Sequence, residues 1–159
     1  MSKKEKLKKT LVEQILDKAK IPYESLAFNA LVEPDNLPVG LAKSDIYKTL
    51  ALTGDKTGPL IGILPITAHL AEKKLAAVSG NKKVSMIPQK DLQRTTGYVH
   101  GANNPVGIHQ TKAFPIFFEQ AAENRDFIVV SSGEVGRSVK VNPQQLAEFV
   151  AASFTDLSE

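Results

Sequence analysis

A tight turn between two apolar segments is the feature that most constrains how this chain can fold. Residues 44–52 and 60–64 are rich in Ile, Leu and Thr, which suit a pleated strand, and residues 53–58 between them hold two glycines and an aspartate. So short a connection joins antiparallel neighbours, whereas parallel strands need a crossover of about a dozen residues or more. Residues 132–136 form a second link of this kind. The sheet therefore cannot be purely parallel.

The remaining chain alternates between helical and strand patterns. Apolar residues at helical spacing predict helices over residues 6–20, 68–78, 89–94 and 143–151. We expect Thr67 to cap the second of these helices and Asn142 the last. Short β-branched and aromatic runs predict further strands over residues 23–28, 82–86, 114–118, 127–131 and 137–141.

These elements predict an α/β domain on the border of the α+β class, with one mixed, mostly antiparallel sheet flanked by helices. At 159 residues the chain is expected to form a single domain, residues 1–159. We expect loose ends at residues 1–5 and 153–159, because the first segment is basic and the last is short and acidic.

Lys48 is the one charge on an apolar face of the strand at residues 44–52. In a strand, Lys48 shares one face with Ile46 and Leu50, while Tyr47 and Thr49 lie on the other. An ammonium without a partner is costly to bury. Lys48 therefore either reaches water at a sheet edge or points into a cleft that receives an anionic or carbonyl-bearing ligand. The strand pattern alone leaves both interpretations open.

Residues 94–107 hold three glycines, two asparagines and a proline, which predicts an irregular loop. Gly and Asn accept positive φ angles, so successive backbone N–H groups can point the same way and form a nest for an oxyanion or a phosphate. An ordinary surface loop fits the same composition.

Together, these two stretches resemble those of the YbaK/EbsC group. Ile-Tyr-Lys-Thr-Leu at 46–50 is followed by Arg-Thr-Thr-Gly-Tyr at 94–98 and by Gly-x-x-x-Pro-x-Gly at 101–107. Lys-Lys-Val at 82–84 and Ser-Ser-Gly at 131–133 extend the likeness. The group consists of aminoacyl-tRNA deacylases related to the editing domain inserted in bacterial prolyl-tRNA synthetases. The resemblance implies a YbaK-like fold.

The resemblance also implies a catalytic centre at Lys48 and Gly101. Lys48 matches the group's key lysine and would hold the terminal adenosine ribose or phosphate, or the ester oxygen. Gly101 matches the loop that closes on the aminoacyl group. The substrate-binding residues that the resemblance implies are Phe28, Tyr47, Thr49, Thr96, Gly97, Tyr98, Ala102, Asn103 and Ser138.

Some positions depart from the group's usual pattern. Tyr98 could equally belong to the core. Phe28 stands where a typical Cys-tRNA deacylase has an aromatic hydroxyl, and Ser138 stands where an Asp is usual. The segment at residues 29–45 is shorter than in that enzyme. These departures leave the preferred amino acid open.

The function that the resemblance implies is trans-editing, the deacylation of mischarged aminoacyl-tRNA, foremost Cys-tRNA(Pro). It would proceed by substrate positioning and oxyanion stabilisation without a protein nucleophile. A deacylase for Ala- or Ser-charged tRNA and a non-catalytic module that binds tRNA or a nucleotide are the alternatives. The expected partners are the 3′ end of aminoacyl-tRNA and, as a further candidate, prolyl-tRNA synthetase. The expected location is the cytoplasm.

Several other kinds of site are excluded. The chain has no cysteine, so it has neither disulfides nor thiolate nucleophiles. His69, His100 and His109 lack the spacing of a zinc site, and no Gly-x-Ser-x-Gly elbow occurs. No apolar run approaches the roughly 20 residues of a membrane helix. We therefore expect no metal, no cofactor and no membrane span, and only His100 lies where it could reach a ligand.

The net charge of +3 is unevenly distributed. Residues 1–20 hold seven Lys against three acids, and residues 72–94 hold six Lys or Arg against two acids. Both regions could meet phosphates, although a solvated helix face explains the first region equally well.

Overall fold

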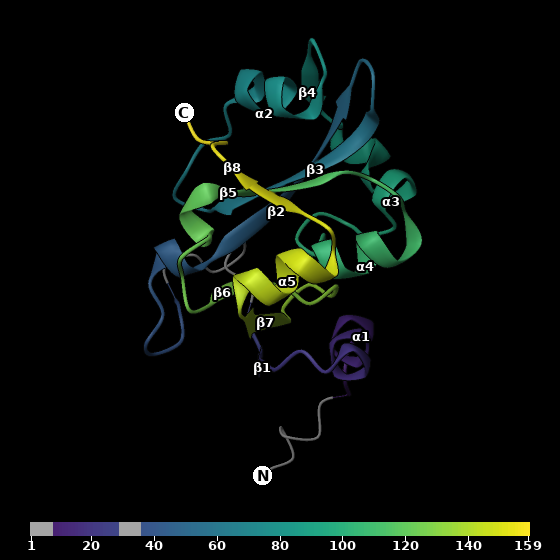
Figure 1. Ribbon diagram of the computed structural model, residues 1–159. Helices are drawn as coiled ribbons and strands as arrows, with labels where there is room; N and C mark the ends of the chain where they lie inside the picture. The colour runs from purple at the N-terminus through teal and green to yellow at the C-terminus, as the bar shows by residue number, and fades with distance from the viewer. Residues whose placement is uncertain (1–7, 29–35) are drawn as a thin grey trace.

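The computed structural model describes residues 8–28 and 36–159, and its strands form two sheets (Figure 1). The five-stranded sheet has the order β4 (Val84–Met86), β2 (Tyr47–Gly54), β3 (Gly58–Pro65), β5 (Ile116–Glu119), β8 (Ser153–Thr155). The three-stranded sheet has the order β1 (Tyr23–Leu26), β7 (Ser138–Val141), β6 (Ile128–Ser131). An isolated parallel bridge between Ile46 and Val129 links β2 to β6.

The strand pairing confirms the mixed, mostly antiparallel arrangement. β2 pairs antiparallel with β3 and β4, and β7 pairs antiparallel with β1 and β6. Among the described strands, β5 alone forms parallel ladders, with β3 and β8. The expectation of one sheet was wrong in that the strands divide between two.

Helices flank both sheets. They are α1 (Leu11–Ala19), α2 (Glu72–Ser79), α3 (Gln89–Thr96), α4 (Pro105–Thr111) and α5 (Pro143–Phe149), with 3-10 turns η2 (Lys43–Asp45) and η3 (Gln120–Ala122). Figure 1 shows α2 and β4 at one end of the molecule and α1 with β1 at the other. No helix in the described parts of the chain is long and apolar enough to cross a membrane.

The five-stranded sheet is buried on both faces, and β2 shows this most clearly. Tyr47 and Ala51 belong to the main core between the two sheets and their helices, whereas Leu52 belongs to a second cluster beneath α2. Leu50 packs against that second cluster. The alternation predicted for this strand is therefore confirmed, although it begins at Tyr47 because Lys43–Asp45 form η2.

The C-terminal segment is an integral part of the sheet, so the predicted loose end at residues 153–159 was wrong. Ser153–Thr155 form β8, which pairs in parallel with β5. Leu157 is fully buried, and its N–H donates to Glu119 Oε1 at 2.8 Å. The apolar side chains in this acidic tail hold it against the core. The predicted loose end at residues 1–5 lies outside the described residues.

Two predictions about helix starts were also wrong. α2 begins at Glu72 with Ala71 at its N-cap, not after Thr67. The predicted irregular loop contains α4, whose first residue is Pro105 and whose N-cap Asn104 accepts from the N–H of Gly107 at 2.6 Å. A proline at the first position of a helix costs no hydrogen bond, so Asn-Pro can start a helix. The irregular loop is therefore confined to residues 97–104.

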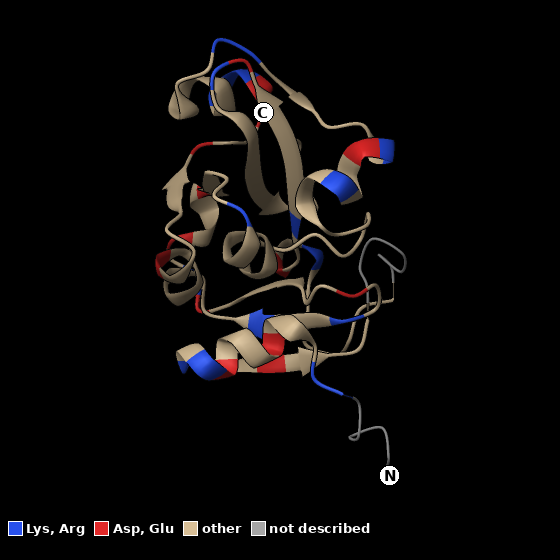
Figure 2. Cartoon of the chain, turned by 90° about the vertical axis from the view of Figure 1, so that its right-hand side faces the viewer, with Lys and Arg blue, Asp and Glu red and all other residues tan. Residues whose placement is uncertain are grey.

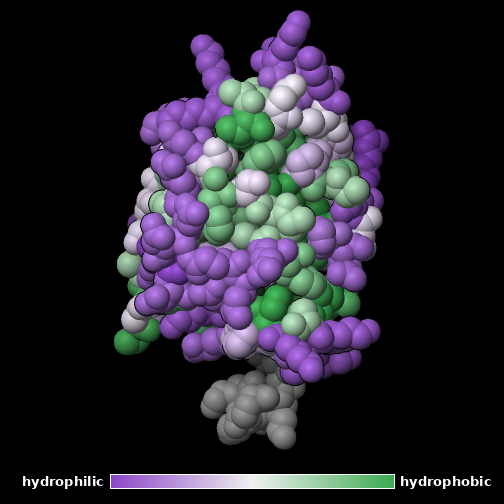
Figure 3. All heavy atoms as spheres, viewed as in Figure 1, coloured by the Kyte–Doolittle hydropathy of each residue, from purple (hydrophilic) through white to green (hydrophobic). Residues whose placement is uncertain are grey.

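Apolar and charged side chains occupy different parts of the surface. Viewed as in Figure 1, a central apolar area is framed by hydrophilic side chains (Figure 3). Many Lys and Arg residues lie at the end of the molecule far from the N-terminus, interspersed with acids (Figure 2).

Candidate functional site

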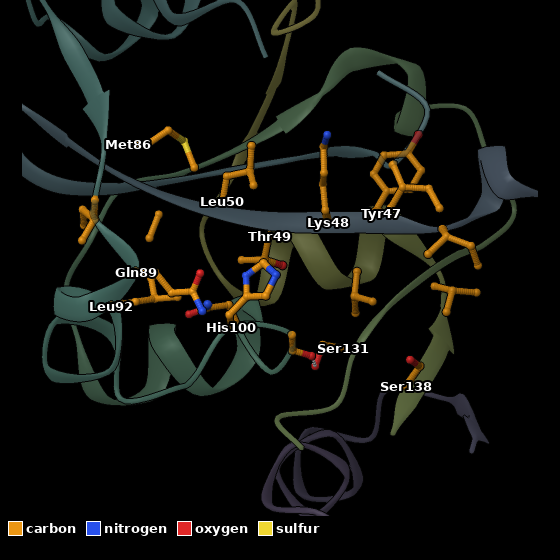
Figure 4. Close-up of a pocket in the computed structure, with 18 residues that line it drawn as sticks. Tyr47, Lys48, Thr49, Leu50, Met86, Gln89, Leu92, His100, Ser131 and Ser138 are labelled. Carbon is orange, nitrogen blue, oxygen red and sulfur yellow. Dashed lines mark hydrogen bonds between the residues drawn. The ribbon is translucent and has the colours of Figure 1, made fainter. Parts of the chain in front are cut away.

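A cavity of about 330 Å³ lies beside β2, and 18 residues line it (Figure 4). They come from β2, the end of β4, the start of α3, the loop at residues 97–104, and strands β6 and β7. The strand and the loop that the sequence singled out therefore face the same cavity, although about 50 residues separate Lys48 from Gly101.

The cavity lies where β2 lacks a strand partner along one edge. β3 pairs with β2 from Tyr47 to Gly54, but β4 pairs on the opposite edge only from Leu52 to Gly54. At the other end of that edge, Ile46 bridges to Val129 of β6. The edge between these contacts is open, and it forms one wall of the cavity.

Lys48 lines the cavity and is half-buried. Its Nζ donates to the carbonyl of Ala68 at 2.8 Å, and burial lowers the pKa of its ammonium. An ammonium carries three N–H groups, so further donors remain for a ligand. Figure 4 shows that Lys48 leaves β2 on the side opposite to His100 and Ser131. Lys48 and the loop therefore lie on different sides of the strand edge.

Thr49 extends from β2 toward His100 (Figure 4). Its Oγ1 and the Oδ1 of Asn103 are the two buried polar side-chain atoms without a hydrogen-bond partner in the described parts of the chain. Both residues line the cavity. A buried polar atom without a partner costs about 1–3 kcal/mol, so a ligand that satisfies such atoms gains binding energy.

Hydrogen bonds fix the loop that forms the opposite wall. Asn104 Nδ2 donates to the carbonyl of Ala102 at 3.0 Å, and Ser131 Oγ donates to the carbonyl of Gly101 at 3.3 Å. Gly101 has a φ of +90°, which favours glycine over other residues. His100 is exposed at the cavity mouth.

The cavity contains no activated nucleophile among the described residues. Ser131 and Ser138 both donate to backbone carbonyls, those of Gly101 and Phe28. No described hydrogen bond joins His100 to a hydroxyl group, and the lining residues that the structure describes include no carboxylate. Within residues 8–28 and 36–159, no cluster of His, Asp and Glu could hold a metal ion. The site can position and polarise a ligand.

The structure brings six of the predicted site residues together at the cavity. These are Tyr47, Lys48, Thr49, Gly101, Asn103 and Ser138. Burial raises the pKa of the Tyr47 phenol. The parts these residues play toward a substrate stay predictions.

Five other predicted site residues are not among those that line the cavity. Gly97 ends α3 with a φ of +90°, and Ala102 is buried, with its N–H bonded to the carbonyl of Val99 at 2.9 Å. Thr96 is buried, and its Oγ1 accepts from the N–H of Tyr98 at 3.1 Å. The carbonyl of Phe28 accepts from Ser138 Oγ at 3.0 Å, and its side chain packs in a cluster with Ile46 and Val129, which line the cavity. The predicted effect of the short segment at residues 29–45 falls partly outside the described residues.

Sequence reasoning left three polar cavity residues out of the predicted site. His100 was considered only as a candidate, and Ser131 only as part of a turn. Gln89 carried no signal, because only the tertiary fold brings the start of α3 to the edge of β2.

The chain is similar to known proteins over most of its length. The aminoacyl-tRNA editing domain family matches residues 36–149. EbsC of Enterococcus faecalis, a proposed Cys-tRNA(Pro)/Cys-tRNA(Cys) deacylase, is 34% identical over 163 residues, which cover 99% of this chain and 98% of that protein. These matches confirm the resemblance that the motifs carried.

Two crystal structures share the fold. One is of a proposed trans-editing enzyme for prolyl-tRNA synthetase, with a TM-score of 0.76 and 18% identity over 93% of this chain and 94% of the other. The second is of a hypothetical protein, with a TM-score of 0.79 and 19% identity over 93% of this chain and 99% of the other.

Proposed function

The chain belongs to the aminoacyl-tRNA editing domain family, and from this premise we propose that it removes the wrong amino acid from mischarged tRNA. The observation that carries the proposal is the position of the cavity. Its walls, the strand with Lys48 and Thr49 and the loop with Gly101, all lie within the matched residues 36–149.

Cysteine on tRNA(Pro) is the proposed substrate. The E. faecalis relative bears the name of a Cys-tRNA deacylase. A cavity of about 330 Å³ is at the small end of the range for ligand sites, which suits a small amino acid joined to a ribose. Two buried oxygens without partners, in Thr49 and Asn103, suit a side chain with a polar hydrogen such as a thiol.

The proposed mechanism needs no protein nucleophile. The substrate thiol attacks the carbonyl carbon of its own ester, the bond from that carbon to the ribose oxygen breaks, and the ribose oxygen takes up the thiol proton. The products are free tRNA and a cyclic thioester of cysteine. Backbone donors stabilise the oxyanion, and Lys48 holds the ribose or the terminal phosphate. On a substrate without a thiol, water would have to attack.

The basic region at residues 72–94 is the proposed contact for tRNA phosphates. Lys82 and Lys83 are exposed just before β4, and Lys90 and Arg94 are exposed on α3. Both elements contribute residues to the cavity wall. Prolyl-tRNA synthetase is the proposed second partner, and the cytoplasm is the proposed location, because charged tRNA and the synthetase are found there.

A deacylation panel tests the proposal. Purified protein is incubated with Cys-, Ala- and Ser-charged tRNA(Pro) and with Pro-tRNA(Pro), and the loss of the ester is followed. We expect rapid loss of cysteine, abolished by Lys48→Ala but not by Lys18→Ala, which removes an exposed lysine from α1. If Ala or Ser is released instead of cysteine, that amino acid is the one removed, and water must be the attacking group. No turnover on any charged tRNA would refute the proposed deacylase activity and favour a non-catalytic binding module.

A further inference from the structure

The open edge of β2 presents a defined pattern of backbone groups. In an antiparallel pair, residues alternate between those that exchange both hydrogen bonds with the partner strand and those that direct both groups away. Pro65 faces Tyr47 and Pro59 faces Thr53. A proline has no N–H to donate, so these are the positions that do not bond across the pair. Thr49 follows the same alternation and directs its N–H and C=O away from β3.

Three observed hydrogen bonds agree with this alternation. The N–H of Ile61, which faces Ala51, donates away from β2 to the carbonyl of Pro115 at 2.9 Å. The carbonyl of Ala51 accepts from Ile87 at 3.1 Å, on the side of β4. The carbonyl of Ile46, of the opposite parity, accepts from Ile66 at 2.9 Å on the side of β3. The N–H and C=O of Thr49 therefore point to the open edge.

No hydrogen bond within residues 8–28 and 36–159 reaches the backbone N–H or C=O of Thr49. The bond from Ile87 to Ala51 closes the edge at one end, and the Ile46–Val129 bridge closes it at the other. The gap has room for about one residue of an added strand, since a strand rises about 3.3 Å per residue. The cavity occupies this gap.

The charges of the cavity limit how an amino group can bind there. Among residues 8–28 and 36–159, Lys48 and His100 are the basic lining residues, and the lining contains no Asp or Glu. An α-amino group that meets only these residues must therefore be held by neutral acceptors. Backbone carbonyls on the open edge are such acceptors.

We propose that the aminoacyl group binds as a one-residue strand opposite Thr49. Its carbonyl oxygen accepts from the N–H of Thr49, and its α-amino group donates to the carbonyl of Thr49, as in a hydrogen-bonded antiparallel pair. This inference rests on the proposed function and specifies how the same site reads the part common to all α-aminoacyl esters.

The pairing also fixes the direction of the amino-acid side chain. Residues directly opposite each other in a sheet place their side chains on the same face. The side chain of the bound residue therefore lies beside that of Thr49, on the side of His100 (Figure 4). A small turn of Thr49 or Asn103 then brings one of the two unpartnered oxygens to a thiol or hydroxyl hydrogen.

A matched pair of variants at one position tests the backbone contact. Thr49→Val keeps the N–H and removes only the hydroxyl, whereas Thr49→Pro removes the N–H as well. Proline is tolerated on an open strand edge where no ladder bond is lost. We expect kcat/KM for the preferred charged tRNA to be about 100-fold or more lower for Thr49→Pro than for Thr49→Val, since one oxyanion donor is worth that much. Equal rates for the two folded variants would overturn the inference.

Binding measurements on the unmodified protein keep the inference testable if Thr49→Pro does not fold. The probe is 3′-cysteinylamido-3′-deoxyadenosine, which cannot be hydrolysed like an ester. We expect its addition to slow hydrogen exchange at the amide of Thr49, with no change at Leu50, which bonds to β3. Replacing the cysteinyl group by 3-mercaptopropionyl, which lacks the amine, should weaken binding about tenfold. If the probe binds but leaves Thr49 exchange and amine dependence unchanged, the inference fails while the proposed function stands. If wild-type protein deacylates no charged tRNA, the proposed function itself fails.

Discussion

Replacing Gly107 by alanine should drive the ring of Tyr98 into the loop of the candidate site. A Cβ atom at residue 107 would lie 1.8 Å from the Tyr98 hydroxyl oxygen and 2.6 Å from Cζ. Ordinary contact begins near 3.4 Å, so the ring would have to withdraw by about 1.6 Å. The ring also lies near Gly133, since a Cβ built at that residue would be 3.3 Å from Tyr98 Cε1.

The displacement should reach the site because Tyr98 is joined to the loop. Its N–H bonds to Thr96 Oγ1 at 3.1 Å, and His100 and Gly101 follow directly in the chain. Overpacking of this kind costs about 1–3 kcal/mol, and alanine returns at most about 1 kcal/mol through its better helix propensity in α4. We therefore expect a net loss of up to about 2 kcal/mol in the free energy of unfolding, with a larger proportional loss in deacylation.

Urea denaturation and kcat/KM on the preferred charged tRNA measure these two effects. The matched control is Gly62→Ala, because a Cβ there meets its neighbours at 3.7 Å or more and should cost no stability. Adding Tyr98→Phe to Gly107→Ala removes the atom in the closest contact, so the double variant should recover part of both losses. If Gly107→Ala is as stable and active as Gly62→Ala, the ring moves freely and the link between Tyr98 and the loop is wrong.

Three further predictions concern Lys48, the C-terminal segment and the basic region at residues 72–94. Burial lowers the pKa of the Lys48 ammonium, so this group loses its proton at a pH below its ordinary pKa of 10.5. We therefore expect kcat/KM to decline as the pH rises toward 10.5. Lys48→Arg should remove this decline if the variant retains activity, because a guanidinium stays protonated. Leu157→Ala should lower the free energy of unfolding by about 2–5 kcal/mol in urea, because this side chain is fully buried; a change under 1 kcal/mol would contradict the role assigned to the C-terminal segment. The double variant Lys82→Glu, Lys83→Glu should raise KM for charged tRNA and make this KM less dependent on salt. Cleavage of an aminoacyl-adenosine ester, which lacks the tRNA phosphates, should stay unchanged. An equal loss of activity on both substrates would show that these lysines do not act through tRNA phosphates.

The elements that the sequence predicted well are those with local signals. The turn at residues 53–58 does join β2 to β3, and β3 lies between β2 and β5 as its apolar composition indicated. α5 begins after Asn142, whose Oδ1 accepts from the N–H of Gln145 at 2.8 Å. In each case the signal and the structure it specifies lie within a few residues of each other.

The elements that sequence reasoning missed depend on distant partners. α4 has only seven residues in a stretch rich in Gly and Asn, and burial of Val106 and Ile108 in the core stabilises it. β8 has three residues, and its only strand partner within the described chain is β5, more than 30 residues earlier. Neither segment has enough apolar periodicity of its own to outweigh the local preference for a loop or a tail.

The candidate site combines both situations. Lys48 and the glycine loop could be identified from motifs, but the open edge of β2 could not, because an unpaired strand has the same residue pattern as a paired one. Within the described residues, the fold leaves the N–H and C=O of Thr49 without a hydrogen-bond partner, and it recesses the edge between β4 and β6, where another chain cannot pair with it along its length. In the proposed pairing, this short edge binds the backbone of a single residue. Both cavity serines are bonded to backbone carbonyls, which agrees with the proposed mechanism, in which the protein supplies position and hydrogen-bond donors and the reacting group arrives with the substrate.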